Sequence, residues 1–204
     1  MAARDLKIET AFATLPLPGQ VESGDLSLVK RVGKGTLIAV VDGLGHGQEA
    51  ASAAHAAIAA LDRYAREPLA DLVRRCHTAL LGMRGVVLAL AYLDPQAATM
   101  TWLGVGNIGG LVLHADATSR PPRIGLVPTA GVVGADQPHP TSRVVPLTPG
   151  DTIIFFSDGI RDGFAESLTL PDTPQSIADF IITRYVKGTD DALVLVARYA
   201  RQSA

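Results

Sequence analysis

The sequence predicts an α/β (α+β) protein built as a layered sandwich, with antiparallel β-sheets inside and helices packed outside. Three observations support this prediction. Seven segments have the length and apolar or alternating pattern of strands. Three segments have helical periodicity. The order is strands, two helices, a run of strands, one helix and a last strand, which suits antiparallel sheets better than alternating βαβ units.

The strand candidates surround the helical segments on both sides. Two of them, residues 26–32 and 36–41, come before the first helix. Five more follow the second helix at residues 86–93, 100–103, 111–114, 152–156 and 193–199. The short connections between most of them favour one compact unit.

The helix candidates have clear start and stop signals. Residues 48–66 place many alanines between larger apolar residues, which predicts a helix that packs closely against its neighbours. Pro68 ends that run and can open a second helix, whose apolar face begins with Leu69, Leu72 and Val73. Thr173 is a suitable N-cap for a third helix over residues 174–185.

Composition limits the possible classes of protein. With 204 residues, of which 48% are hydrophobic, the chain predicts a single domain over residues 1–204. A net charge of -2 provides no basic field for nucleic acid, so we expect no nucleic-acid partner. The only cysteine, Cys76, cannot close an intramolecular disulfide.

Localisation and assembly follow from the same survey. No segment reaches the roughly 20 apolar residues of a membrane-spanning helix, and the charged first 20 residues do not resemble a signal peptide. We therefore expect a cytoplasmic protein without a membrane partner. The oligomeric state is not determined by the sequence, and a monomer is plausible.

Two aspartates stand at the ends of apolar strand candidates, each followed by glycine. Asp42 follows five apolar residues and precedes Gly43, and Asp158 precedes Gly159 in the same way. Taken alone, each pair is also explained as a tight turn with a capping aspartate. Because the pattern occurs twice, it favours two carboxylates that emerge at strand ends.

A third acidic position lies directly before the last strand candidate. Asp190 and Asp191 are adjacent, so their carboxylates repel each other unless the turn is exposed or a cation lies between them. Aspartates without a cysteine or a spaced histidine pair favour Mg²⁺ or Mn²⁺. Two such ions can activate a water molecule and neutralise a phosphoryl group.

Five motifs, in this order, give the chain a family resemblance: SGD at 23–25, VDGLGHG at 41–47, GVGN at 104–107, LTPGDTIIFFSDGI at 147–160, and TDDALVLVAR near the end. Together they resemble the metal-dependent protein phosphatases, the PPM family, in its SpoIIE-type branch. The resemblance covers nearly the whole chain. It implies a four-layer αββα sandwich of two antiparallel sheets flanked by helices.

The resemblance also implies roles for individual residues. Asp42 would bridge two Mn²⁺ or Mg²⁺ ions, with the Gly43 carbonyl as a further ligand. Asp158 and Asp190 would complete the metal site, and these three aspartates would be the catalytic residues. Asp25 and Asp191 would act from behind the ligands, and either Asp190 or Asp191 could be the third ligand.

The implied activity is hydrolysis of phosphoserine or phosphothreonine on a protein by a metal-activated water. Resemblance to the small stand-alone members of the branch implies phosphorylated STAS-domain proteins of a stressosome, RsbS-like or RsbR-like, as partners whose dephosphorylation resets a bacterial stress signal. Two departures are visible: Leu193 replaces a common threonine, and the arginine that clamps phosphate in eukaryotic members has no counterpart.

Other interpretations remain open at this point. The chain could be a catalytically silent phosphoprotein-binding module of the same fold, or a metal phosphodiesterase that acts on nucleotides. Cysteine catalysis is disfavoured because no C-x5-R loop surrounds Cys76. We interpret His46 and Asn107 as loop and turn residues, and Arg161 as a possible substrate contact.

Overall fold

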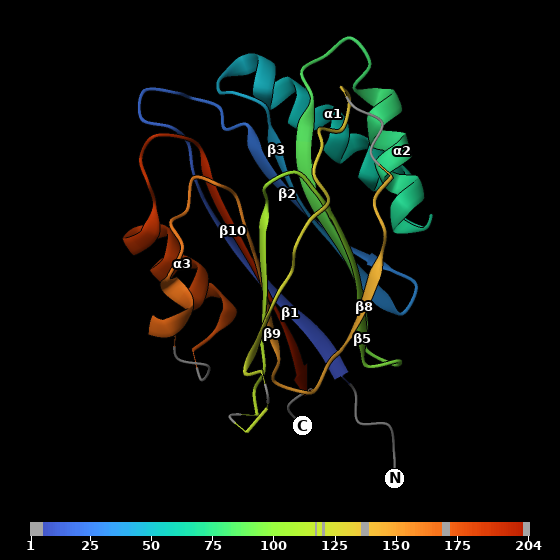
Figure 1. Ribbon diagram of the computed structural model, residues 1–204, viewed down its shortest axis with the longest axis vertical. Helices are drawn as coiled ribbons and strands as arrows, with labels where there is room; N and C mark the ends of the chain where they lie inside the picture. Colours follow the sequence, from blue (N-terminus) through green and yellow to red (C-terminus); the bar gives the residue numbers. More distant parts are fainter. Residues whose placement is uncertain (1–5, 117, 120, 136–138, 169–171, 202–204) are drawn as a thin grey trace.

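Two five-stranded antiparallel sheets form the centre of the computed structural model, which describes residues 6–116, 118–119, 121–135, 139–168 and 172–201 (Figure 1). The first sheet has the order β2-β3-β4-β5-β8. Its strands are β2 (Asp25–Val32), β3 (Gly35–Gly43), β4 (Val86–Asp94), β5 (Thr99–Val105) and β8 (Arg143–Pro146). We call it the β3 sheet.

The second sheet, called the β10 sheet, has the order β1-β10-β9-β6-β7. Its strands are β1 (Leu6–Leu15), β6 (Gly109–Leu113), β7 (Arg123–Gly125), β9 (Thr152–Phe156) and β10 (Ala192–Arg201). Strands from both ends of the chain pair here, because β1 lies antiparallel to β10 over its whole length.

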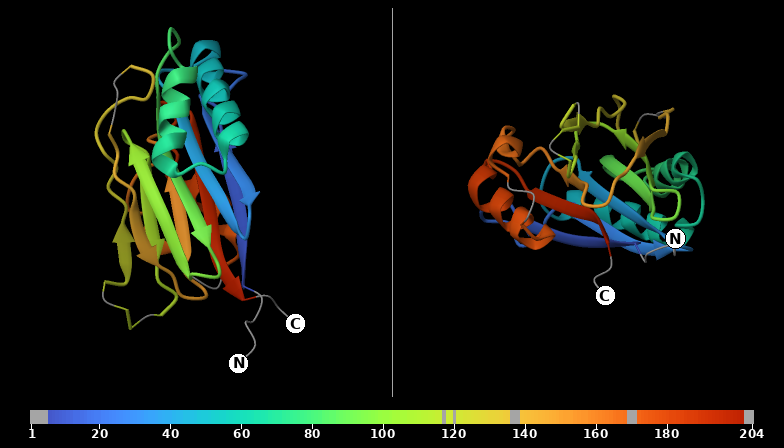
Figure 2. Two further views of the ribbon diagram at one scale, coloured as in Figure 1. Left: turned by 90° about the vertical axis from the view of Figure 1, so that its right-hand side faces the viewer. Right: turned by 90° about the horizontal axis from the view of Figure 1, so that it is seen from below.

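Helices cover the outer face of each sheet. Helices α1 (Gln48–Tyr64) and α2 (Leu69–Ala79) pack on the β3 sheet, and α3 (Pro174–Tyr185) packs on the β10 sheet (Figure 2). A short 3₁₀ helix, η1 (Phe164–Ser167), lies beside α3. The four layers are therefore helix, sheet, sheet and helix, which confirms the predicted fold class.

Three hydrophobic cores hold these layers together. One lies between α1, α2 and the β3 sheet, one between the two sheets, and one between α3 and the β10 sheet. Strand β3 contributes to two cores, because Ile38 and Val40 face the other sheet while Leu37, Ala39 and Val41 face the helices. Burial on both faces explains its unbroken apolar run.

The helix limits follow local chemistry. Pro68 precedes the first residue of α2, where its missing N–H is not needed. At the start of α3, the Thr173 side chain accepts a hydrogen bond from the Ser176 N–H at 3.1 Å. Among the helices that the structure describes, none is long and apolar enough to cross a membrane.

Candidate metal centre

Asp42 and Asp25 stand opposite each other at one end of the β3 sheet. They are direct partners in the antiparallel register of β2 and β3. The Gly43 N–H donates to the Gly24 carbonyl at 3.0 Å, which extends this pairing past Asp42. A Cβ atom on Gly43 would lie 2.2 Å from the Ala50 carbonyl oxygen, so only glycine lets α1 begin this close to the strand end.

The environment of Asp25 and Asp42 disfavours their negative charge. Asp25 is only 3% exposed, and its Oδ2 atom has no hydrogen-bond partner. Burial raises the pKa of Asp25 to about 7, opposed by a hydrogen bond with Ser157 and reinforced by the nearby carboxylates. Burial likewise raises the pKa of Asp42 to about 8, and the charge of Asp25 adds to this effect.

Asp158 follows β9 and brings a third carboxylate from the other sheet. The Asn107 side-chain amide, in the turn between β5 and β6, donates to Asp158 Oδ2 at 2.9 Å. The Lys187 ammonium donates to the Asp158 main-chain carbonyl at 2.5 Å. Both groups hold the loop after β9 in place. The Asn107 amide contacts only the Oδ2 atom of Asp158 and not its Oδ1 atom.

Asp190 and Asp191 precede β10 and differ in how their oxygens are used. Asp191 is buried, and its two oxygens accept from the Leu17 and Gly24 N–H groups, each at 2.7 Å. Asp190 is partly exposed, and its Oδ1 accepts from the Asp191 N–H at 2.9 Å. Asp191 therefore anchors the chain before β2. The Oδ2 atom of Asp190 takes part in none of these hydrogen bonds.

A second glycine brings the ends of β9 and β10 together. A Cβ atom on Gly159 would lie 1.9 Å from the Asp191 carbonyl oxygen. The Ser157 N–H donates to the Leu193 carbonyl at 3.0 Å, so the two strands remain paired up to the acidic loops. The glycine after Asp158 is thus required by close backbone approach.

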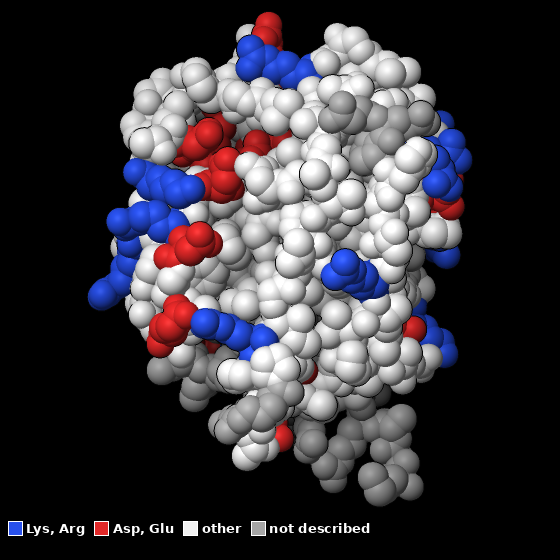
Figure 3. Space-filling view, in the orientation of Figure 1, with Lys and Arg blue, Asp and Glu red and all other residues white. Residues whose placement is uncertain are grey.

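These residues form the acidic cluster, which unites both sheets: Asp25, Asp42, Asp158, Asp190 and Asp191. Acidic side chains gather in a hollow of the molecular face in Figure 3, and Lys and Arg side chains lie along its border. Among the described residues, no three acidic, histidine or cysteine side chains already stand as a ready set of ligands for one ion. The unpartnered Asp25 Oδ2 and the mutual repulsion nevertheless fit a cation.

Three contacts at the cluster were not predicted from the sequence. Asn107 was interpreted as a turn residue only, and Ser157 and Lys187 were not considered. Two signals in the sequence could have pointed to them: the position of GVGN at the end of a strand for Asn107, and the basic residue shortly before the paired acids for Lys187. His46 is exposed in the loop between β3 and α1, and we assign it no role.

Comparisons with solved structures identify the fold. The crystal structure of RsbX in complex with magnesium has a TM-score of 0.82 and 19% identity, covering 97% of this chain and all of that one. The catalytic domain of the phosphatase PstP in complex with two manganese ions has a TM-score of 0.74 and 17% identity, with coverages of 96% and 100%. The fold is therefore that of the PP2C-type phosphatases.

A more similar structure comes from work on the bacterial stressosome, described as a modular system adapted to control secondary messenger signalling. It is 34% identical, with a TM-score of 0.85, and the match covers 94% of this chain and 100% of that chain. The profile of the family named for stage II sporulation protein E (SpoIIE) matches residues 33–200. The chain belongs to the SpoIIE family. The search of curated proteins found no match.

Proposed function

We propose that this protein is a metal-dependent protein serine/threonine phosphatase. The observation that carries the proposal is the acidic cluster, in which burial and the charges of aspartates from both sheets raise the pKa of Asp25 and Asp42, and one buried oxygen, Asp25 Oδ2, has no hydrogen-bond partner. Membership in the SpoIIE family supports the assignment to phosphate chemistry. A buried group of like charges with no basic partner inside it is costly unless cations bind there.

Two Mn²⁺ or Mg²⁺ ions would be held by Asp42, the Gly43 carbonyl, Asp158 and Asp190. Asp25 and Asp191 would support them from behind. The use of both Asp191 oxygens by backbone N–H groups supports Asp190 as the third ligand. When bound, the ions would activate a water molecule and neutralise charge on the phosphoryl oxygens.

The residues of the chain supply positioning. Asn107 fixes one oxygen of Asp158, and Lys187 fixes the backbone of the same residue. Asp25 is held by a hydrogen bond with Ser157, while its Oδ2 atom is buried and receives no hydrogen bond from the described residues. In the proposed reaction the water oxygen bonds to phosphorus and gives up one proton, the ester P–O bond breaks, and the departing oxygen of serine or threonine takes up a proton, without a phosphoenzyme intermediate.

The proposed substrates are phosphorylated STAS-domain proteins of a stressosome, whose dephosphorylation would reset a stress signal. The 34% identical structure from stressosome work supports this choice. The segment RCHTALLGMRG at residues 75–85 and the loop VDGLGHG at 41–47 also suggest a particular likeness to RsbX, and the fold of RsbX is consistent with it. At 19% identity this likeness concerns the fold alone. We therefore propose, on the sequence motifs, that the protein has a role like that of RsbX.

The test is a dephosphorylation assay on candidate proteins. Phosphorylated RsbS-like and RsbR-like proteins are incubated with the protein, with and without Mn²⁺, and mass spectrometry identifies the phosphate that leaves. We expect Mn²⁺-dependent release that is lost in Asp42→Asn and Asp158→Ala variants whose circular dichroism is unchanged. Release that persists in either variant contradicts the mechanism.

The second candidate is a silent phosphoprotein-binding module of the same fold. It is favoured by one observation, namely that no three ligand side chains in the described residues already surround one point. Calorimetric Mn²⁺ titration beside the release assay separates the two functions. A silent module would bind the phosphoprotein without metal-dependent turnover.

A further inference from the structure

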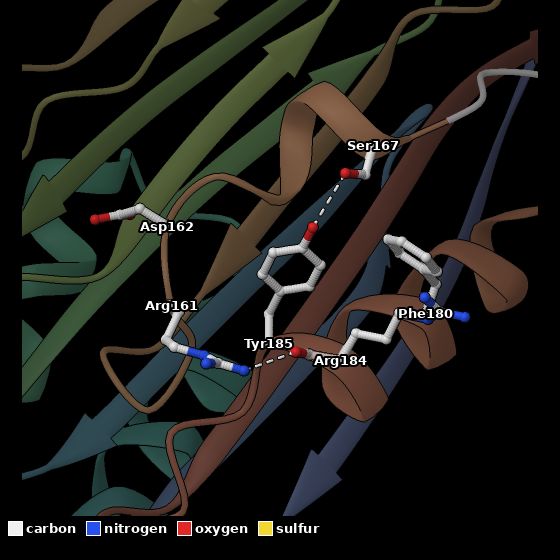
Figure 4. Close-up of a pocket in the computed structure, with 6 residues that line it drawn as sticks. All are labelled: Arg161, Asp162, Ser167, Phe180, Arg184 and Tyr185. Carbon is white, nitrogen blue, oxygen red and sulfur yellow. Dashed lines mark hydrogen bonds between the residues drawn. The ribbon is translucent and has the colours of Figure 1, made fainter.

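A surface pocket of about 740 Å³ lies between the loop after β9 and the end of α3. Six residues line it: Arg161, Asp162, Ser167, Phe180, Arg184 and Tyr185 (Figure 4). The first two come from the loop that follows Asp158, and the last three come from α3. None of them belongs to the proposed metal site.

The pocket is rigidly joined to the loop that carries Asp158. The Arg161 N–H donates to the Tyr185 carbonyl at 2.7 Å, and the Arg161 guanidinium donates to the Arg184 carbonyl at 2.8 Å. Ile160 and Val186 form an isolated β-bridge between the two segments. Because Arg161 is three residues from Asp158, their Cα atoms are at most about 11 Å apart.

The walls of the pocket combine positive charge with aromatic surface. The Arg184 guanidinium lies 5.4 Å from the centre of the Phe180 ring, and the Tyr185 ring lies 5.9 Å from that of Phe180. The Tyr185 hydroxyl is hydrogen-bonded to Ser167 at 3.1 Å, which fixes the tyrosine ring at the pocket wall. Such a surface can receive one apolar side chain beside one anionic side chain.

The charge balance around the pocket is positive. Arg161, Arg184 and the neighbouring Lys187 are exposed cations, whereas Asp162 is the only acid among the lining residues that the structure describes. Basic side chains also border the acidic hollow in Figure 3. The carboxylates of an acidic peptide are repelled by the aspartates of the acidic cluster. They can be held instead by the basic side chains at its border.

We infer that this pocket docks an acidic segment of the phosphoprotein substrate, three or four residues from the phosphorylated residue. One acidic side chain pairs with Arg184 and a neighbouring one with Arg161, because the two guanidinium groups lie on opposite sides of Tyr185 (Figure 4). An adjacent apolar side chain packs on Phe180 and Tyr185. An extended chain covers about 10 to 14 Å in three or four residues, which is enough to span the limit of about 11 Å between the Cα atoms of Asp158 and Arg161. The inference rests on the proposed phosphatase function and adds the substrate feature that the enzyme selects.

The experiment compares two phosphothreonine peptides that differ only at positions three and four residues to either side of the phosphothreonine. One carries glutamate there and the other glutamine. With Mn²⁺ present, we expect the wild-type protein to have a kcat/KM about fivefold higher for the glutamate peptide, mainly through a lower KM. In Arg184→Glu this preference should disappear, and Arg161→Gln should reduce it without adding a negative charge.

The matched control is Arg143→Glu, which reverses an exposed cation on β8 at the far edge of the other sheet. It should keep the full preference. Equal kcat/KM for the two peptides in the wild type, or an unchanged preference in Arg184→Glu, would overturn the docking role. Loss of the preference in Arg143→Glu as well would show a nonspecific charge effect and would also overturn it.

A binding measurement separates this inference from the proposed function. Fluorescence anisotropy with the unphosphorylated, labelled glutamate peptide reports docking without turnover. If no peptide is hydrolysed, the phosphatase proposal fails, and binding that is lost in Arg184→Glu still supports the pocket. If the peptides are hydrolysed but the glutamate peptide shows no binding preference over the glutamine peptide, the pocket assignment fails alone.

Discussion

Two glycines explain why aspartates from four strand ends can meet in one hollow. Gly43 and Gly159 each stand where a backbone carbonyl of another segment occupies the place of a Cβ atom. The sequence showed both as part of an aspartate-glycine pair, which is equally typical of a tight turn. Only the approach of α1 and of the chain before β10 distinguishes close packing from turn chemistry.

Gly159→Ala tests this explanation. Its Cβ atom would lie 1.9 Å from the Asp191 carbonyl oxygen, so the ends of β9 and β10 must separate. We expect a loss of about 2 kcal/mol or more in the free energy of unfolding, measured by urea denaturation. Gly125→Ala is the control, because nothing lies within 4 Å of its Cβ position. Equal stability of the two variants would contradict the close-approach argument.

The raised pKa values of Asp25 and Asp42 predict the pH dependence of the metal-free protein. Both groups hold protons in the folded state at pH values where the unfolded chain, with a pKa near 3.8, has released them. The stability that these two groups contribute should therefore be greatest below about pH 4 and fall as pH rises from there to about 7 to 8, where the loss levels off. Between pH 5 and pH 8 we expect a fall on the order of 2 to 4 kcal/mol. Urea unfolding in the presence of a chelator measures this.

Asp25→Asn should flatten that profile, because the substitution removes one buried charge and its repulsion of Asp42. A metal-free wild-type protein that becomes more stable between pH 5 and pH 8 would show that the two carboxylates are not forced together as the structure indicates.

Asn107 shows how a residue can be more than its local pattern suggests. Its turn position between β5 and β6 was predicted, but its hydrogen bond to Asp158 depends on the packing of the two sheets. We expect Asn107→Ala to weaken Mn²⁺ binding about tenfold in a calorimetric titration, because an oriented carboxylate becomes mobile. Gln96→Ala removes an exposed amide from the β4–β5 turn and should leave the dissociation constant unchanged. Equal affinities in both variants would make Asn107 a turn residue only.

At the scale of elements, α1 shows close packing of a helix on a sheet. Its buried face consists of six alanines and Leu61, and the Cys76 thiol of α2 lies 3.7 Å from the Ala57 carbonyl. The alanine-rich pattern predicted this close approach. The start of α1 packs against Gly43 at the end of β3, directly after Asp42, so the position of the helix matters to the site.

Ala57→Leu should disturb this packing. Ala57 is fully buried, and a larger side chain there must push α1 away from α2 or from the sheet. We expect a loss of about 1 to 3 kcal/mol in the free energy of unfolding. Ala59 is exposed on the same helix, and Ala59→Leu should stay within about 0.5 kcal/mol of the wild type. A similar loss in both variants would point to helix propensity instead of packing.

Three of the four edge strands, β1, β7 and β8, were not predicted from the sequence, whereas the fourth, β2, was. β1 has charged residues among its apolar ones, and Lys7 and Glu9 form an ion pair at 2.8 Å on this edge strand. β7 and β8 are short and lie at the opposite edges of the two sheets. Edge strands are buried less than central ones, so their apolar signal is weaker.

For the whole molecule, the order of elements predicted antiparallel sheets with outer helices, and the family resemblance supplied the number of sheets. The order of elements could not predict which distant segments touch. The bond from the Leu17 N–H to Asp191 joins residues 174 positions apart, and it depends on β1 and β10 being neighbours. The acidic positions were predictable from strand ends. Which of Asp190 and Asp191 anchors the backbone, and which is left to bind a metal ion, depends on such contacts.

The proposed metal site needs residues from both sheets. Asp25 and Asp42 come from the β3 sheet, whereas Asp158 and Asp190 come from loops of the β10 sheet. Ion binding between them would therefore stabilise the contact of the sheets by mass action.

The most direct measurement is phosphate release from a phosphothreonine peptide by the wild type and by Asp42→Asn, with Mn²⁺ titrated from zero. We predict no release without metal, saturating release with Mn²⁺ in the wild type, and a loss of at least about a hundredfold in Asp42→Asn. Release that is independent of Mn²⁺, or that is equal in the two proteins, would contradict the claim that the acidic cluster is a catalytic metal centre.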